Sequence, residues 1–287
     1  MTYRPRTSPL HAARAAVACA YCAALAAGAL ISAHPLVLAA LIVATLAAGG
    51  LAGVGRELRR AGLLGLPFAL VLGLINPLVT RDGLTVIARA GEVPVLGRLD
   101  ITLEATANGG MLGLRALALI LACALYAATV DPDNVLRLFR RVSFRSALTA
   151  TLATRMLPVL GRDARRLSEA QRCRPDAPAP RLAVVRATLA NALDRAVDVA
   201  ATLELRGYGA GLRAPAARRP WSRHDVGFAA AAVALVALAI AADTGGLASF
   251  AAYPRLQADL GPVPAAVAGA LIVCALLPFA ERRGIGP

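Results

Sequence analysis

Lysine is absent from this sequence, and all 31 of its basic residues are arginine. The phosphate-binding loop of nucleotide hydrolases ends in Gly-Lys-Ser or Gly-Lys-Thr, so the chain cannot contain that loop. Schiff-base chemistry and general-base chemistry by lysine are excluded for the same reason. If ATP drives this protein, a different subunit must therefore hydrolyse it.

Aromatic and acidic residues are also scarce. Phe, Trp and Tyr together make up 4% of the chain, and only 17 acidic residues oppose the 31 arginines. A net charge of +14 would suggest nucleic acid as a partner of a soluble chain, but the basic stretches lack interleaved aromatics that could stack on bases. We therefore expect no nucleic-acid partner.

Side chains that commonly catalyse reactions or bind metals are few and dispersed. Cys19 and Cys22 form a lone C-x-x-C inside an apolar run, and the other three cysteines are far apart in the sequence. This spacing implies neither a disulfide framework nor a zinc site. The three histidines are isolated from any serine or cysteine nucleophile pattern. We therefore expect no catalytic residue, no metal site and no cofactor.

Long apolar segments are the dominant feature that the sequence does contain. Hydrophobic residues make up 58% of the chain, above the share usual in soluble domains. A transmembrane helix needs about 20 predominantly apolar residues. The sequence therefore predicts an all-α polytopic membrane protein with about six transmembrane helices. The six segments span residues 12–31, 35–54, 61–79, 106–129, 226–242 and 263–280.

Arginine is distributed asymmetrically among the connections between these segments. It is abundant at both termini, around Arg56 and in a central block of eighteen arginines from Arg137 to Arg223, whereas acidic residues outnumber it in the other connections. Arginine-rich connections tend to face the cytoplasm. We expect a multi-pass protein of the plasma or inner membrane with both termini cytoplasmic. The external stretch 80–105 mixes Gly, Pro and β-branched residues and is expected to form a small hairpin or re-entrant element.

Three parts follow from this layout. Residues 1–130 supply the N-terminal transmembrane helices, 131–225 form a cytoplasmic insert, and 226–287 form a C-terminal transmembrane hairpin. Two interpretations remain for residues 146–160, which either lie in the cytoplasm or enter the bilayer and leave it at Pro158, where a kink is expected.

The insert contains two amphipathic helical patterns, Ser146 to Arg174 and Arg181 to Arg206, separated by a proline-rich break. The second pattern carries an apolar stripe with steps of three and four residues, which is expected to pack against another helix. Gly207 suits the left-handed position that follows the last helical residue. The stripe consists of Leu182, Val185, Leu189, Leu193, Ala196, Ala200 and Leu203.

Three polar features of the chain leave alternatives open. Asp194, Arg195 and Asp198 could hold a metal-bound diphosphate, although a solvated helix face with ion pairs is the simpler interpretation. Arg115 lies inside a membrane segment and is a functional candidate, although snorkelling or an outward-shifted helix boundary also explains it. The Asp-Pro-Asp-Asn sequence at 131–134 is expected to cap a short helix.

Several motifs occur in an order and spacing that resemble those of one family. The motifs are Asn76-Pro77-Leu78 with Gly83, Ile101 to Ala105 with Gly109, Thr129 to Asn134, Arg155 to Pro158, Glu169 to Arg174, and Leu203 to Tyr208. Through them, residues 60–225 resemble the transmembrane T component of energy-coupling factor transporters. These transporters are the vitamin and metal-ion importers of the ABC superfamily.

The resemblance implies a function in coupling. The two insert helices would be crossing coupling helices, and the arginine at each tip would dock into a groove on one of two ABC ATPase subunits. ATP-driven movement would then reach a small substrate-binding membrane subunit, which releases a vitamin or a transition-metal ion inside. The resemblance assigns ATPase binding to Cys173, Arg174, Leu205, Arg206 and Gly207, and structural motif positions to Asn76, Pro77 and Pro158.

One residue departs from the family pattern, because Pro175 stands where the first arginine signature normally has glycine. Proline cannot adopt the left-handed cap conformation, and it disfavours helical geometry at the residue before it. We therefore expect Arg174 to lie on extended backbone, and we rank Arg206 as the stronger docking residue.

Two rival functions remain open on sequence alone. An integral-membrane enzyme acting on a diphosphate lipid would use the acidic pair on the second insert helix and would need a divalent metal. A membrane anchor that recruits an acidic soluble protein without transport would bind its partner independently of ATP.

Overall fold

The computed structural model describes residues 6–79, 85–93, 97–139, 144–173, 181–207, 220–248, 250–251, 257–258 and 261–281. The described residues are mainly α-helical, with two small antiparallel sheets of two strands each, so the all-α class is confirmed. The helices are α1 Pro9–Ala12, α2 Ala15–Ile31, α3 Pro35–Leu51, α4 Gly55–Val79, α5 Leu103–Thr129, α6 Pro132–Phe139, α7 Phe144–Arg172, α8 Arg181–Leu205, α9 Arg223–Thr244 and α10 Pro262–Leu276. The strands are β1 Val86–Val93, β2 Gly97–Thr102, β3 Phe250–Ala251 and β4 Gln257–Ala258.

The chain divides into two compact units. The first combines Met1–Val135 with Trp221–Pro287, and the second is Leu136–Pro220. The second unit lies within the expected insert, residues 131–225, whose cytoplasmic location stays a prediction.

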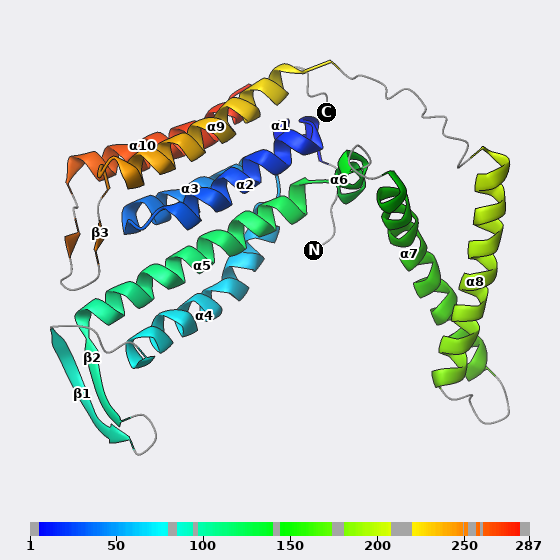
Figure 1. Ribbon diagram of the computed structural model, residues 1–287, viewed down its shortest axis with the longest axis horizontal. Coiled ribbons are helices and arrows are strands. Elements are labelled where there is room, and N and C mark those ends of the chain that lie inside the picture. The colour runs from blue at the N-terminus through cyan, green and yellow to red at the C-terminus, as the bar shows by residue number, and fades with distance from the viewer. Residues whose placement is uncertain are drawn as a thin grey trace. The chain divides into compact units, whose positions relative to one another are not determined.

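The first unit contains the membrane-spanning helices. Among the described residues, four helices are long and apolar enough to cross a membrane: Gly55–Pro77 of α4, α5, α9, and Pro262–Phe279, which combines α10 with a short 3-10 turn. The apolar helices α2 and α3 have 17 residues each, or about 25 Å, which is the lower limit for a crossing. These six helices coincide with the six expected segments and lie side by side (Figure 1). The protein is thus a multi-pass membrane protein with about six transmembrane helices.

The core of the first unit is built largely from alanine and leucine around one aromatic cluster. The ring of Tyr21 in α2 lies edge-on to Phe228 in α9, at 5.2 Å between centroids, and to Phe279, at 6.3 Å. The Tyr21 hydroxyl donates a hydrogen bond of 2.8 Å to the carbonyl of Ala275 in α10. The cluster therefore links α2, α9 and α10, while alanine lets the helix backbones approach closely.

An antiparallel hairpin connects α4 to α5. Strands β1 and β2 pair from Val86 opposite Thr102 to Val93 opposite Gly97, with irregular register between. In the described parts of residues 80–105, the two strands pair antiparallel, as expected for a hairpin. A smaller pair, β3 and β4, lies between α9 and α10.

The second unit consists mainly of α7 and α8, which follow one another in opposite directions (Figure 1). Their bounds agree with the two expected helices to within two residues, and α7 continues as a helix through Pro158. The preceding helix α6 begins as expected, because the Asp131 carboxylate accepts hydrogen bonds from Asp133 N at 3.0 Å and Asn134 Nδ2 at 2.8 Å.

Candidate functional site

The end of α8 has the geometry expected for the second arginine signature. The amide of Arg206 donates to the carbonyl of Thr202 at 3.2 Å, and the amide of Gly207 donates to Glu204 at 2.9 Å. Gly207 has a φ of +73°, in the left-handed region that glycine adopts at little cost. The helix therefore stops at a defined residue, and Arg206 occupies its C-cap.

The side chains around this helix end are open to solvent. Leu205 is 88% exposed, and both Arg206 and Gly207 are also exposed. Within the described part of the chain, Arg206 makes no ion pair. An exposed guanidinium beside an exposed leucine offers a charged and an apolar contact to the same partner.

The end of α7 is described only up to Cys173. The amide of Cys173 donates to the carbonyl of Glu169 at 3.3 Å, and its side chain is exposed. Arg174 and Pro175 lie outside the described residues. The expected extended backbone at Arg174 therefore stays a prediction.

The face of α8 that packs on α7 differs from the expected apolar stripe. Leucines of the stripe are largely exposed, with Leu182 at 73% and Leu193 at 69%. The more buried positions lie on a neighbouring face of α8. They are Val184, Thr188, Ala192, Val199 and Leu203.

The expectation that the leucine stripe forms the helix crossing is therefore wrong, except at Leu203. The physical reason is the size and chemistry of the packed face. Thr188 and Ala192 are small enough for close approach, and Arg195 reaches Asp163 of α7 with 3.6 Å between Nη2 and Oδ2. The leucines are left as an apolar surface of the second unit.

Within the described residues, no further candidate metal ligands cluster with the acidic pair on α8. Asp194 and Asp198 are both exposed, and the intervening Arg195 is paired with Asp163 of α7. Among the described residues, no group of three or more His, Cys, Asp or Glu side chains could hold a metal ion. This arrangement corresponds to the interpretation of a solvated face with an ion pair.

The Asn-Pro motif and the motif that opens α5 lie together. Asn76 Nδ2 donates to the carbonyl of Ala105 at 3.1 Å. Glu104 is only 2% exposed, and its carboxylate accepts from the Thr85 hydroxyl at 2.9 Å and the Thr85 amide at 3.3 Å. Pro77 lies inside α4, two residues before its end. Motifs separated by about 25 residues in the sequence thus form one polar junction at the ends of α4 and α5.

Farther along the two helices from this junction, glycines bring the backbones of α4 and α5 into contact. A Cβ added at Gly113 would lie 2.7 Å from the carbonyl oxygen of Ala69, and one at Gly109 would collide with Gly73. Beside this contact lies an apolar groove of about 510 Å³ between the two helices. Small residues spaced four apart commonly mediate such contacts between membrane helices.

Arg115 lies in the middle part of α5, and its side chain contacts the end of α2. Its Nη2 donates to the carbonyl of Ser32 at 3.0 Å, and Ser32 is the C-cap of α2. A guanidinium is favourable at the negative end of a helix dipole. The hydrogen bond to Ser32 gives the guanidinium a polar partner within the first unit, and a functional role for Arg115 stays a prediction.

A comparison with protein-family models finds one match. The model for the cobalt transport protein family, CbiQ, matches residues 6–215. The chain belongs to the CbiQ family. A search of curated proteins found no match. Membership of CbiQ makes the chain a component of a membrane transporter, and the match runs from α1 through both arginine signatures.

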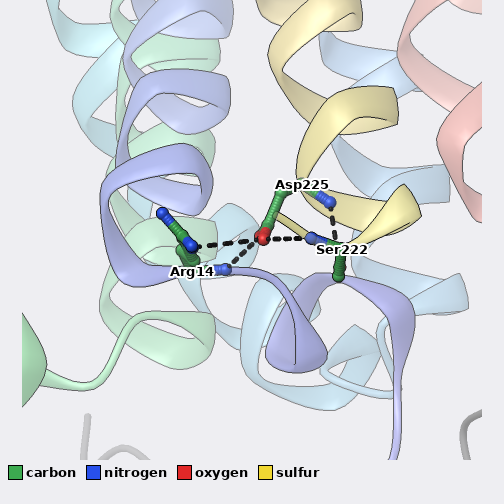
Figure 2. A network of polar contacts seen from close by, with 3 residues as sticks. All are labelled: Arg14, Ser222 and Asp225. Atoms are coloured by element: carbon green, nitrogen blue, oxygen red, sulfur yellow. Dashed lines mark hydrogen bonds and ion pairs between the residues drawn. The ribbon is translucent and has the colours of Figure 1, made fainter. Parts of the chain in front are cut away.

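A further polar network lies partly beyond the CbiQ match and was not foreseen from the sequence. Asp225, in the first turn of α9, is buried and accepts hydrogen bonds from the amides of Arg14 at 2.7 Å and Ser222 at 3.0 Å (Figure 2). Arg14 Nε lies 3.3 Å from the same carboxylate, and the guanidinium lies 5.3 Å from the Trp221 ring centre. Only the Ser222–Asp225 capping box has a local sequence signal.

Proposed function

We propose that this CbiQ-family protein is the transmembrane coupling subunit of an energy-coupling factor importer of the ABC superfamily. It would join two ABC ATPase subunits to a small substrate-binding membrane subunit. Hydrolysis of ATP is assigned to the ATPases, in keeping with the absence of lysine from this chain. Membership of a transport family supports the general role, and the end of α8 supports the coupling role.

The observation that carries the proposal is the tip of α8. Arg206 is an exposed guanidinium at the C-cap of a long amphipathic helix, and the left-handed Gly207 ends the helix directly after it. Guanidinium groups form forked, charge-assisted hydrogen bonds with carboxylates. An acidic groove on an ATPase subunit is the partner that matches this chemistry, with Leu205 as an apolar contact beside it.

The packing of α7 against α8 supports transmission between the two tips. The contact includes the Asp163–Arg195 ion pair and a face of small side chains. Packed elements of this kind shift as bodies rather than deforming gradually. Movement imposed at one tip would therefore pass to the other helix and on to the membrane helices.

Substrate and orientation complete the proposal. We assign uptake of a vitamin or a transition-metal ion, recognised by the separate membrane subunit, and the CbiQ family description names cobalt. The distribution of arginine supports a plasma or inner membrane location, with both termini and the insert in the cytoplasm.

Co-purification in detergent tests the proposal. The wild-type chain, co-expressed with ATPase subunits from its own genome, is expected to retain a pair of ATPases. Arg206→Glu should abolish this association, because it places a carboxylate where the groove requires a cation. Arg174→Glu should weaken it less, because Pro175 is expected to place Arg174 on extended backbone.

The matched control is Arg186→Glu, which makes the same charge change at another exposed position of α8. It is expected to leave ATPase binding unchanged. Failure of the wild type to bind any ATPase would refute the coupling role, and equal loss in all three variants would mean that net charge, rather than the tip, governs binding.

A further inference from the structure

The N-terminal segment, Arg6–Arg14, contacts the ends of several helices of the first unit. Arg6 Nη2 forms an ion pair of 2.6 Å with Glu57 Oε1 in the first turn of α4. Leu10 is fully buried, and Ser8 is buried as well. The segment is therefore packed into the helix ends rather than lying free on the surface.

The middle of this segment touches the end of α5. His11 contacts the backbone of Ala128, one residue before the last residue of α5. Its Nδ1 also lies 2.7 Å from the Ser8 hydroxyl. From α5 the chain continues through Asp131 into α6 and leaves the first unit after Val135.

The last residue of the segment holds the start of α9. The backbone amide of Arg14 donates a hydrogen bond to Asp225, and the guanidinium forms an ion pair with the same carboxylate (Figure 2). The guanidinium also lies over the ring of Trp221. Trp221 is the first residue of the chain that belongs to the first unit again. One short segment thus contacts the last turn of α5, shortly before the chain leaves the first unit, and Trp221, where the chain returns to it.

We propose that the N-terminal segment holds the membrane-side ends of the insert in place. Arg14 and Asp225 are the positioning pair through which movement of the insert reaches the membrane helices. The inference rests on the proposed coupling function. The insert can move the membrane helices only if its connections to α5 and α9 are held firmly. If the attachment at α9 were loose, movement at the α8 tip would not be passed on to the membrane helices.

The chemistry of the Arg14–Asp225 contact suits this role. The carboxylate of Asp225 is 2% exposed and receives two backbone amides as well as the guanidinium. Two backbone hydrogen bonds and an ion pair with the guanidinium hold this buried carboxylate in place. The contact joins residues 211 positions apart in the sequence, so no local turn would restore it once it is broken.

The test uses the complete complex of this chain, its two ATPases and its substrate-binding subunit, reconstituted in lipid vesicles. Substrate uptake and ATP hydrolysis are measured together. In Arg14→Gln and Asp225→Asn, ATPase binding and ATP hydrolysis should persist, while uptake per ATP falls about fivefold or more, as for typical coupling between sites. Arg14→Gln keeps the backbone hydrogen bond to Asp225, so it carries the test if Asp225→Asn does not fold.

Two further variants separate positioning from simple stability. Arg223→Gln removes an exposed charge two residues from Asp225 and should leave uptake per ATP unchanged. A further variant has its five native cysteines replaced by serine and carries Arg14→Cys with Asp225→Cys. Its substrate uptake per ATP should fall. A short bifunctional thiol reagent that joins the two new cysteines should then restore it.

The outcomes are distinct from those of the coupling proposal. Normal assembly with unchanged uptake per ATP in Arg14→Gln would overturn this inference alone. The inference would also be overturned if uptake and ATP hydrolysis fell in proportion, or if the cross-link failed to restore uptake per ATP. A wild-type chain that binds no ATPase would overturn the coupling proposal, and this inference with it.

Discussion

Asp163 of α7 and Arg195 of α8 form an ion pair across the two helices of the second unit, with 3.6 Å between the charged atoms. Because Arg195 is 45% exposed, solvent screens the pair, and its contribution to stability is expected to be no more than about 1 kcal/mol. Asp163→Asn and Arg195→Gln should each lower the unfolding temperature slightly. The double variant should cost no more than the larger single change, as a double-mutant cycle of thermal unfolding in detergent would measure. Equal losses that simply add would show that the two side chains do not interact.

Packing of α4 on α5 should be intolerant of side chains at two glycines. Gly113→Val is expected to destabilise the protein by about 1–3 kcal/mol, because its Cβ would press on the Ala69 carbonyl. Gly109→Val should behave in the same way against Gly73. The matched control is Gly110→Val, where an added Cβ meets nothing within 4 Å. Thermal unfolding in detergent separates the three, and a loss at Gly110 as large as at Gly113 would contradict the close helix contact.

The left-handed conformation at Gly207 predicts a cost for any β-carbon there. Gly207→Ala is expected to destabilise the end of α8 by about 1–2 kcal/mol, because a left-handed backbone crowds Cβ against the carbonyl. Gly161→Ala, at an open position within α7, should instead be neutral or stabilising by up to about 1 kcal/mol. Hydrogen exchange of the last turn of α8 measures the first effect. Unchanged exchange in Gly207→Ala would show that the turn is not left-handed.

Stability of the N-terminal segment should depend on pH through His11. Burial lowers the pKa of His11 below its usual 6.5, and the positive charge of Arg6 lowers it further. The hydrogen bond with the backbone of Ala128 raises the pKa but does not cancel these effects. The folded state therefore binds fewer protons than the unfolded state, so this contribution is fully present above pH 6.5 and is lost as the pH falls below it. His11→Gln should abolish this component of the pH dependence of thermal unfolding. An unfolding temperature that rises on acidification only when His11 is present would contradict the sign.

Local features of the structure could be predicted from the sequence, because neighbouring residues determine them. The cap at Asp131 and the helix end at Gly207 each depend on residues within one turn. The six apolar segments follow from the runs of consecutive hydrophobic residues. α7 continues as a helix through Pro158, and the kink expected there stays a prediction.

Long-range features could not be predicted in this way. Periodicity identified an apolar stripe on α8 but not the face that packs, because packing against α7 also depends on the size of Ala192 and the charge of Arg195. The contact of Arg14 with Asp225 joins residues 211 apart, and neither has a sequence neighbour that signals the other. Arg174, which lies outside the described residues, remains a prediction from sequence.

The central claim is that the tip of α8 docks on an ATPase subunit, and contact at that tip can be measured directly. A photo-reactive amino acid placed at Leu205, whose side chain is 88% exposed, would be activated in membranes that contain the co-expressed subunits. We predict a cross-link to an ATPase subunit that disappears when Arg206→Glu is added and persists with Arg186→Glu. A cross-link to lipid alone, or an ATPase cross-link that Arg206→Glu leaves unchanged, would contradict the account.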